Sequence, residues 1–172
     1  LRRQEVGEEL AKSRCSVVAI NDSPDKPDLQ VRLRQAVSSL SRTVPCRLIE
    51  NTRNMGFVRS MNAAAEEAIE HRRDVLLLNS DTVVFPGAID EIQTVAYSDP
   101  MIGFVSPRSN NATICSLPHD GEFRSFTPVE AHVAFAEVSK LLPRFHFVPT
   151  GVGFCLFIKS EVLEEFGLFD EC

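Results

Sequence analysis

Four consecutive large aliphatic residues, Val75 to Leu78, are followed at once by the polar sequence Asn-Ser-Asp-Thr at positions 79–82. An apolar run of this length, with no alternation of polar residues, is typical of a central strand covered by helices on both faces. Ligands of open α/β sheets collect beyond the carboxyl ends of the strands. The run therefore predicts a buried strand that delivers Asp81 to a binding edge of a sheet.

Strands and helices are predicted to alternate on both sides of this run. The predicted strands are residues 15–20, 47–50, 75–78, 102–105, 145–148 and 154–158, and the predicted helices are 28–41, 54–69, 86–95, 128–142 and 161–166. Apolar residues recur at helical spacing in the helical segments and cluster in short β-branched or aliphatic runs in the others. The alternation favours an α/β fold with a doubly wound sheet. Because the later half mixes strands with polar coil, an all-parallel sheet is not expected.

Composition and charge restrict the classes of partner. The 172 residues are 44% hydrophobic and 24% charged, which suits one soluble domain spanning residues 1–172. A net charge of -6, with scattered Lys and Arg, provides no basic surface for nucleic acid. No apolar stretch reaches the roughly 18 residues of a membrane span, and no charged leader precedes an apolar run.

The cysteine count indicates a reducing compartment. Five cysteines without CxxC spacing, mostly beside apolar residues, are expected to be reduced core thiols rather than metal ligands or disulfide partners. They are Cys15, Cys46, Cys115, Cys155 and Cys172. A cytoplasmic protein is expected.

Acidic and amide side chains follow two of the predicted strands. Asn21 and Asp22, with Asp25 nearby, follow the first predicted strand, and the second group contains Asp81. A carboxylate held after a rigid strand suits a hard cation such as Mg²⁺ or Mn²⁺ that also takes phosphate oxygens. The same residue types also favour helix caps and turns, so a purely structural role for Asp81 stays open on these residues alone.

Several motifs in register resemble the family 2 glycosyltransferases. The resemblance covers nearly the whole chain, and the combination is far more specific than any single motif. It rests on Val18-Ala-Ile-Asn-Asp-Ser-Pro-Asp25, Asn51-Thr-Arg-Asn54-Met-Gly56-Phe57 with Asn62, Leu76-Leu-Leu-Asn-Ser-Asp-Thr82 with Pro86-Gly87, Ile102-Gly-Phe-Val-Ser-Pro107 with Asn110-Asn111, and Gly151-Val-Gly-Phe-Cys155 through Gly167-Leu-Phe-Asp-Glu171.

The resemblance implies a GT-A fold, with a mixed, mostly parallel sheet and helices on both faces. It also implies a nucleotide-diphosphate sugar donor, a divalent metal and inversion at the anomeric carbon. The acceptor would be a glycan or a lipid-linked hydroxyl, in glycan or surface-polysaccharide synthesis at the inner face of a membrane, with a rhamnose-type transfer as one plausible case. Relative to the family, the chain is expected to be a fragment that lacks the first strand.

Carried over by position, Asp81 resembles the last residue of the family's Asp-x-Asp motif and would ligate the metal and the diphosphate. Asn79 stands where the first carboxylate is usual, which leaves one strong ligand and predicts modest metal affinity. Ile20 departs from the acidic pair that contacts the base, so that contact falls to Asn21 or Asp22. The full set of expected donor-binding residues is Asn21, Asp22, Asp25, Asn54, Gly56, Arg59, Asn79, Ser80, Asp81, Gly151 and Gly153.

Structural alternatives accompany these assignments. Arg59 could lie on a solvated helix face, and Gly56 could serve only a left-handed turn. Asn62 is expected to be structural. Gly151 and Gly153 permit close approach of the backbone to a ligand or to another strand. His146 is interpreted as an ordinary strand residue.

The catalytic base is expected outside the chain. The family's base resembles an Asp of a Glu-Asp pair after the Phe-Asp-Glu turn, beyond Cys172, while Asp170 is an acceptor-side candidate only. One competing hypothesis is a receiver-type Mg²⁺-binding phosphoacceptor domain, with Asp22 and Asp81 in its pocket and Lys159 as an imperfect match for its lysine. Another is a nucleotidyltransferase, for which no Gly-rich basic loop is visible. An isolated fragment could also bind only weakly.

Overall fold

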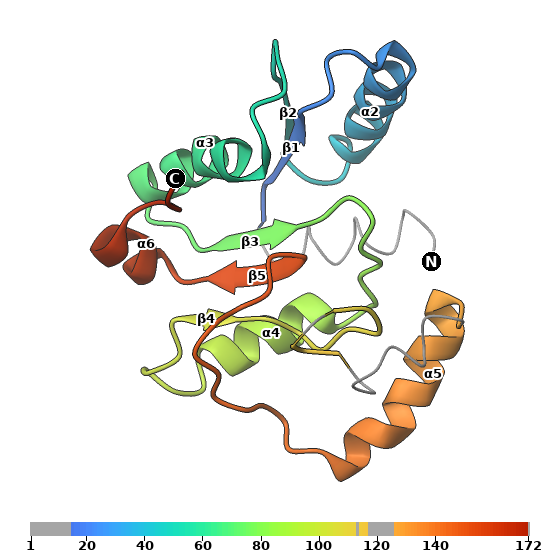
Figure 1. Cartoon of the computed structure of the whole chain (residues 1–172), viewed down its shortest axis with the longest axis vertical. Coiled ribbons are helices and arrows are strands. Elements are labelled where there is room, and N and C mark those ends of the chain that lie inside the picture. The colour runs from blue at the N-terminus through green and yellow to red at the C-terminus, as the bar shows by residue number, and fades with distance from the viewer. Residues whose placement is uncertain (1–14, 113, 117–125, 172) are drawn as a thin grey trace. The chain divides into compact units, whose positions relative to one another are not determined.

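The computed structural model describes residues 15–112, 114–116 and 126–171 of the chain (Figure 1). These residues form a mixed α/β structure with five α-helices and two small sheets. They divide into two compact units. Unit 1 contains the described residues up to Arg73, with Val84–Asp90 and the described residues from Leu163 onward, and unit 2 contains Asp74–Val83 and Glu91–Val162. Each unit is described by itself.

Unit 1 is built on a parallel pair of strands joined by a helix. β1 (Val17–Asn21) pairs with β2 (Cys46–Glu50) in parallel, and α2 (Pro27–Leu40) makes the connection that parallel neighbours require. Pro27 lies in the first turn of α2, where its missing N–H is no loss. Arg34 donates to both carboxylate oxygens of Glu50, at 3.0 and 2.7 Å to Oε2 and 3.2 Å to Oε1, which ties α2 to β2.

The second helix of unit 1, α3 (Phe57–Glu70), begins three residues after the predicted start at residue 54. Gly56 precedes it with φ of +82°, a left-handed conformation that glycine adopts without strain. The alternative prediction for Gly56, a left-handed turn, is therefore correct. A binding role for Gly56 stays a prediction. α3 buries Ser60, Asn62 and Ala65.

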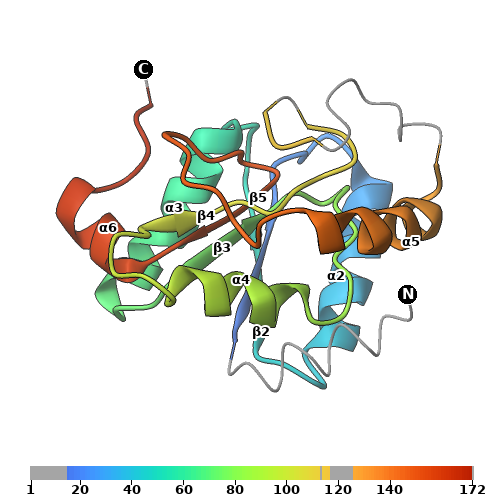
Figure 2. The same cartoon turned by 90° about the horizontal axis from the view of Figure 1, so that it is seen from below.

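Unit 2 contains a three-stranded sheet in the order β3-β5-β4. β3 (Val75–Leu78) and β4 (Phe104–Val105) both run antiparallel to β5 (Cys155–Ile158). Figure 2 shows α4 (Ala88–Ala96) running along the sheet. Its apolar side packs against β5 in a cluster formed by Ile92, Ala96, Cys155 and Phe157. This cluster is the core that holds the strands in place.

The expectation of a mostly parallel sheet is wrong for the described residues. Only β1 and β2 pair in parallel, while both pairings of the larger sheet are antiparallel. β3 is the edge strand of its sheet rather than a central one, and Leu78 is 46% exposed. The apolar run identified β3 correctly, but the direction of its partner depends on how the long connection returns to β5, which no local pattern encodes.

Two predicted strands differ from the structure. Residues 145–148 form no strand, and the segment lies between Pro143 and Pro149, which lack backbone N–H groups for a ladder. Phe145 and Phe147 instead contact each other edge to face, with ring centroids 5.6 Å apart. The strand predicted over 102–105 shortens to β4.

The remaining helices match their predicted positions. α5 (Pro128–Val138) continues into the short 3₁₀ helix η2 (Ser139–Leu141), and α6 (Ser160–Phe166) follows β5. Thr127 and Glu130 form a reciprocal capping box at the start of α5. The polar segment 106–126 is without helix in its described part and contains one isolated bridge, between Ser109 and Ser116.

Cys46, Cys115 and Cys155 are free thiols, but of these only Cys155 is buried, and Cys172 lies outside the described residues. Burial, with the nearby Cys115 thiol, raises the pKa of Cys155 to about 11. Across the part of the chain that the structure describes, no helix combines the length and apolar character needed to cross a membrane.

Candidate functional site

The turn that carries Asp81 follows β3 directly and is fastened to the turn before β5. The Thr82 N–H donates to the Asn79 carbonyl at 3.1 Å, which closes the turn. The Asn79 N–H and the Thr82 hydroxyl both donate to the Phe154 carbonyl, at 2.8 and 3.3 Å. The exposed side chains of Asn79, Ser80 and Asp81 therefore start from a backbone that is held on both sides.

Gly151 and Gly153 lead into β5 beside this turn. A Cβ at Gly151 would lie 2.5 Å from Leu156 Cδ1 and 3.1 Å from Ser106 Oγ, so the missing side chain is needed for packing within unit 2. The Val152 N–H donates to Ser106 Oγ at 2.8 Å and holds the segment there. Of the two roles left open for Gly151, the structure supports close approach to neighbouring protein atoms. Gly153 lies in the turn that enters β5.

Asp81 is the one carboxylate of this turn. The described residues contain no cluster of three or more His, Cys, Asp or Glu side chains that could hold a metal ion. One exposed carboxylate suits the mode in which Mg²⁺ or Mn²⁺ is shared with phosphate oxygens of a ligand. A metal that is bound only together with a diphosphate is compatible with this donor set.

In unit 1, the Asp22 carboxylate is already committed to the protein. It accepts hydrogen bonds from the backbone N–H groups of Met55 and Gly56, at 2.7 and 2.8 Å, and from Asn51 Nδ2 at 2.8 Å. These bonds, that of Met55 most of all, lower the pKa of Asp22 below its ordinary value although burial acts in the opposite direction. Asn54 Nδ2 also donates to the Asp22 carbonyl, at 3.0 Å. Asp22 thus joins the end of β1 to the loop before α3.

Asn21, the last residue of β1, is the better candidate for contact with a ligand. Its side chain is 3% exposed, and Oδ1 accepts from the Ser23 N–H at 3.1 Å. Its Nδ2 is the one buried side-chain nitrogen or oxygen of the described residues that finds no hydrogen-bond partner. Buried amide groups are normally satisfied, so a donor left over at the carboxyl end of a strand is notable.

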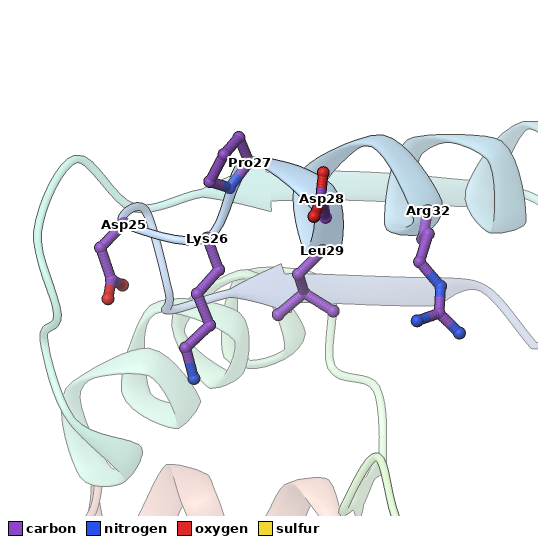
Figure 3. A pocket seen from close by; sticks show the side chains of 6 residues that line it. All are labelled: Asp25, Lys26, Pro27, Asp28, Leu29 and Arg32. Atoms are coloured by element: carbon purple, nitrogen blue, oxygen red, sulfur yellow. The ribbon is translucent and has the colours of Figure 1, made fainter.

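Asp25 lies at the rim of an open surface hollow together with the first turns of α2. Lys26, Leu29 and Arg32 point to one side of the helix, whereas Asp25 lies before it (Figure 3). Because the lining comes from a single continuous stretch, Asp25–Arg32, the hollow is a feature of one helix surface rather than a cleft between elements. It does not bring Asp25 to Asn21 or Asp22.

Arg59 and Asn62, on α3, contact the described carboxyl-terminal segment. Arg59 Nε donates to Glu171 Oε2 at 2.9 Å, so its guanidinium is paired within the protein. Asn62 exchanges two hydrogen bonds with the backbone of Phe169. The structural interpretation of Asn62 is confirmed. Asp170, between these contacts, is exposed.

A polar cluster in unit 2 was not anticipated from the sequence. The Tyr97 hydroxyl donates to Asp74 Oδ2 at 2.7 Å, and Asp74 Oδ1 accepts from the Ser160 N–H at 2.9 Å. Lys159 is 5% exposed, and its Nζ lies 4.9 Å from the centre of the Tyr97 ring. Asp74 precedes β3, Tyr97 follows α4 and Lys159 follows β5. Because they come from separate points of the chain, no sequence motif indicates the cluster.

The position of Lys159 bears on the receiver-type hypothesis. Ile158 pairs with Val75 and Cys155 pairs with Leu78, so Lys159 lies beside the amino end of β3. Asp81 follows the opposite end of the same strand, about 13 Å away for four residues of strand. Lys159 therefore cannot serve a phosphoacceptor at Asp81.

Comparisons with known protein families, with curated proteins and with solved structures found nothing that matches this chain.

Proposed function

We propose that the chain binds a nucleotide-diphosphate sugar and belongs to a metal-dependent inverting glycosyltransferase. The observation that carries the proposal is the Asn79–Asp81 turn, which directly follows β3 and is fixed to the Phe154 carbonyl. It presents one carboxylate and one amide to solvent from a backbone that is hydrogen-bonded at both ends. The proposed family comes from the motif resemblance, and the proposed ligand position comes from the contacts that hold this turn.

Seven of the eleven candidate residues have a defined part in this proposal. Asp81 binds the cation together with the donor diphosphate, and Asn79 and Ser80 contact hydroxyl groups of the sugar or ribose. The unpartnered Nδ2 of Asn21 donates to an acceptor atom of the base. Asp22, Asn54 and Gly56 act indirectly, because they fix the loop that follows β2. When bound, Mg²⁺ or Mn²⁺ would neutralise charge on the departing diphosphate.

The general base is not assigned to a described residue. Inversion requires a general base that removes a proton from the acceptor hydroxyl. We assign this role to none of the described residues. Asp170 remains an acceptor-side candidate. The nucleotidyltransferase hypothesis has no contact that favours it.

Calorimetry of the full-length protein with UDP, dTDP and GDP sugars, with and without Mn²⁺, tests the proposal. At least one sugar nucleotide is expected to bind in a metal-dependent manner. Asp81→Ala is expected to weaken that binding by about tenfold or more, because one charge-assisted metal contact is lost. Unchanged metal-dependent binding in Asp81→Ala would show that the central assignment is wrong.

The matched control is Glu137→Gln, which removes another exposed carboxylate of unit 2, on α5, that pairs with Lys140 of η2. It is expected to bind the donor as the unmodified protein does. Equal losses in both variants would indicate a general effect of net charge rather than a ligand at Asp81. Stable phosphate on Asp81 after treatment with a small phosphodonor would favour the phosphoacceptor class instead.

A further inference from the structure

The segment after α6 is attached to α3 by the side chain of Asn62. Asn62 Nδ2 donates to the Phe169 carbonyl at 2.8 Å, and Asn62 Oδ1 accepts from the Phe169 N–H at 2.9 Å. One amide thus satisfies both backbone groups of one residue, as a neighbouring strand would. Asn62 is 5% exposed, so these two bonds are shielded from solvent. Both residues belong to unit 1.

Two residues further on, Glu171 accepts a long hydrogen bond of 3.4 Å from Asn62 Nδ2 to Oε1, and it also forms an ion pair. Arg59 Nε donates to Glu171 Oε2 at 2.9 Å, and both side chains are about half exposed, at 51% and 45%. The contact uses a single guanidinium nitrogen rather than a bidentate pair. Exposed ion pairs of this kind are weak and are screened by salt. The outer contact is therefore much easier to break than the Asn62 contact.

A left-handed glycine precedes the attached segment. α6 ends where the Gly167 N–H donates to the Leu163 carbonyl at 3.0 Å, and Gly167 has φ of +81°. A left-handed glycine at this position stops the helix and turns the chain. Residues 168–171 then lead from α6 to α3, as the red segment beside α3 shows (Figure 1).

We propose that residues 167–171 form a strap, hinged at Gly167, that is anchored on α3 by Asn62 and latched at its outer end by the Arg59–Glu171 ion pair. Asn62 is the positioning residue of the strap, because it holds the backbone next to Asp170. The latch responds to ionic strength, whereas the anchor does not. The strap is a property of unit 1 and does not depend on the proposed transferase activity.

Backbone hydrogen exchange of the full-length protein, without nucleotide or metal, tests the strap. The Phe169 amide is expected to be protected in the unmodified protein and to exchange about tenfold faster in Asn62→Leu, which removes its acceptor. Arg59→Gln is expected to speed its exchange about two- to threefold at low salt. Raising the salt from about 0.05 to about 0.5 M should speed exchange in the unmodified protein but not in Arg59→Gln.

Arg72→Gln is the matched control, because Arg72 pairs with Glu164 on α6 and not with the strap. It should keep the salt response of the Phe169 amide. The strap would be overturned if that amide exchanged at the rate of an unstructured peptide in the unmodified protein. A salt response that persisted in Arg59→Gln would overturn the latch, and this test holds even if Asn62→Leu fails to fold, because Arg59 is exposed.

Discussion

At the scale of single residues, the contrast between Asn21 and Asp22 is the main result of the structure. The two residues are adjacent, and both were candidates for the same base contact. Asp22 is occupied by two backbone N–H groups and an amide, whereas Asn21 keeps an unpartnered buried donor. The carboxylate thus stabilises the fold, whereas the Asn21 amide nitrogen has no hydrogen-bond partner among the described residues.

The role of Asp22 predicts a pH-dependent loss of stability in Asp22→Asn. The pKa of Asp22 in the folded protein lies below the ordinary value of 3.8. The contribution of its carboxylate to the free energy of unfolding is therefore complete above pH 3.8 and is lost as pH falls through the folded pKa. We expect Asp22→Asn to lower the free energy of unfolding by about 1–3 kcal/mol at neutral pH. Urea denaturation should show this difference shrinking below pH 3.8.

Asp25→Asn serves as the control for this measurement, because Asp25 is an exposed carboxylate of the same loop. It is expected to leave the unfolding free energy within about 0.5 kcal/mol of the original. A difference for Asp22→Asn that stays constant from neutral to acidic pH would contradict the proposed bonding of its ionised carboxylate.

The Tyr97 hydroxyl offers a second titration, since the chain contains a single tyrosine. Its hydrogen bond to Asp74, with burial and the charges of Asp74 and Glu161, raises its pKa to about 12. The ultraviolet absorbance of the phenolate should therefore appear only at pH values well above 10. The pKa of Tyr97 is higher in the folded protein than its ordinary value of 10.0. The contribution of the protonated hydroxyl to the stability of the fold is therefore complete below pH 10.0 and is lost as pH rises through about 12.

Asp74→Asn is expected to bring the Tyr97 pKa back toward 10.0. Glu161→Gln should move it less, because the Glu161 charge is the smallest of the named causes. A Tyr97 that titrates at its ordinary pKa in the unmodified protein would mean that the bond to Asp74 is absent.

At the scale of elements, the junction between β3 and β5 determines where Asp81 lies. The ladder of these strands continues past Leu78 through the bond from Asn79 to Phe154. The turn is therefore an extension of the sheet rather than a loose loop. The close packing of Gly151 against β5 belongs to the same junction.

Gly151→Ala is predicted to destabilise this junction by about 1–2 kcal/mol. Its Cβ would lie 2.5 Å from Leu156 Cδ1, with Ser106 Oγ at 3.1 Å and Phe104 Cδ2 at 3.2 Å, so neighbouring atoms must move. Thermal denaturation should report the loss. Adding Leu156→Val, which shortens the nearest side chain, should recover part of it. Full stability of Gly151→Ala alone would show that the packing is looser than the structure indicates.

At the scale of the whole molecule, the residues predicted to bind the donor belong to two different compact units. Asn21, with the loop that Asp22 organises, belongs to unit 1, and the Asp81 turn with the Gly151–Gly153 segment belongs to unit 2. Within each unit, residues distant in the sequence are joined by direct contacts, such as Asp22 to Met55 and Asn79 to Phe154. The sequence expectation of a single domain stays a prediction.

Local sequence was sufficient for most of the elements. The apolar run at Val75–Leu78 coincides with β3, and the helix predicted over 28–41 corresponds to α2, because hydrophobic periodicity and the position of Pro27 act over a few residues. The polar turn around Asp81 was placed at the end of its strand for the same reason. The mixed α/β class follows from these elements alone.

Tertiary structure decided what local patterns leave open. β3 is an edge strand because, among the described strands, it pairs with β5 alone. Residues 145–148 lie between two prolines, pair with no strand and are irregular. The Asp22 carboxylate is committed to the protein because the backbone N–H groups of Met55 and Gly56, more than thirty residues away, donate to it. The sequence determines the chemical type of each residue. Its hydrogen-bond partners are determined only when distant segments pack together in the tertiary structure. Those partners decide whether a polar side chain supports the fold or remains available to a ligand.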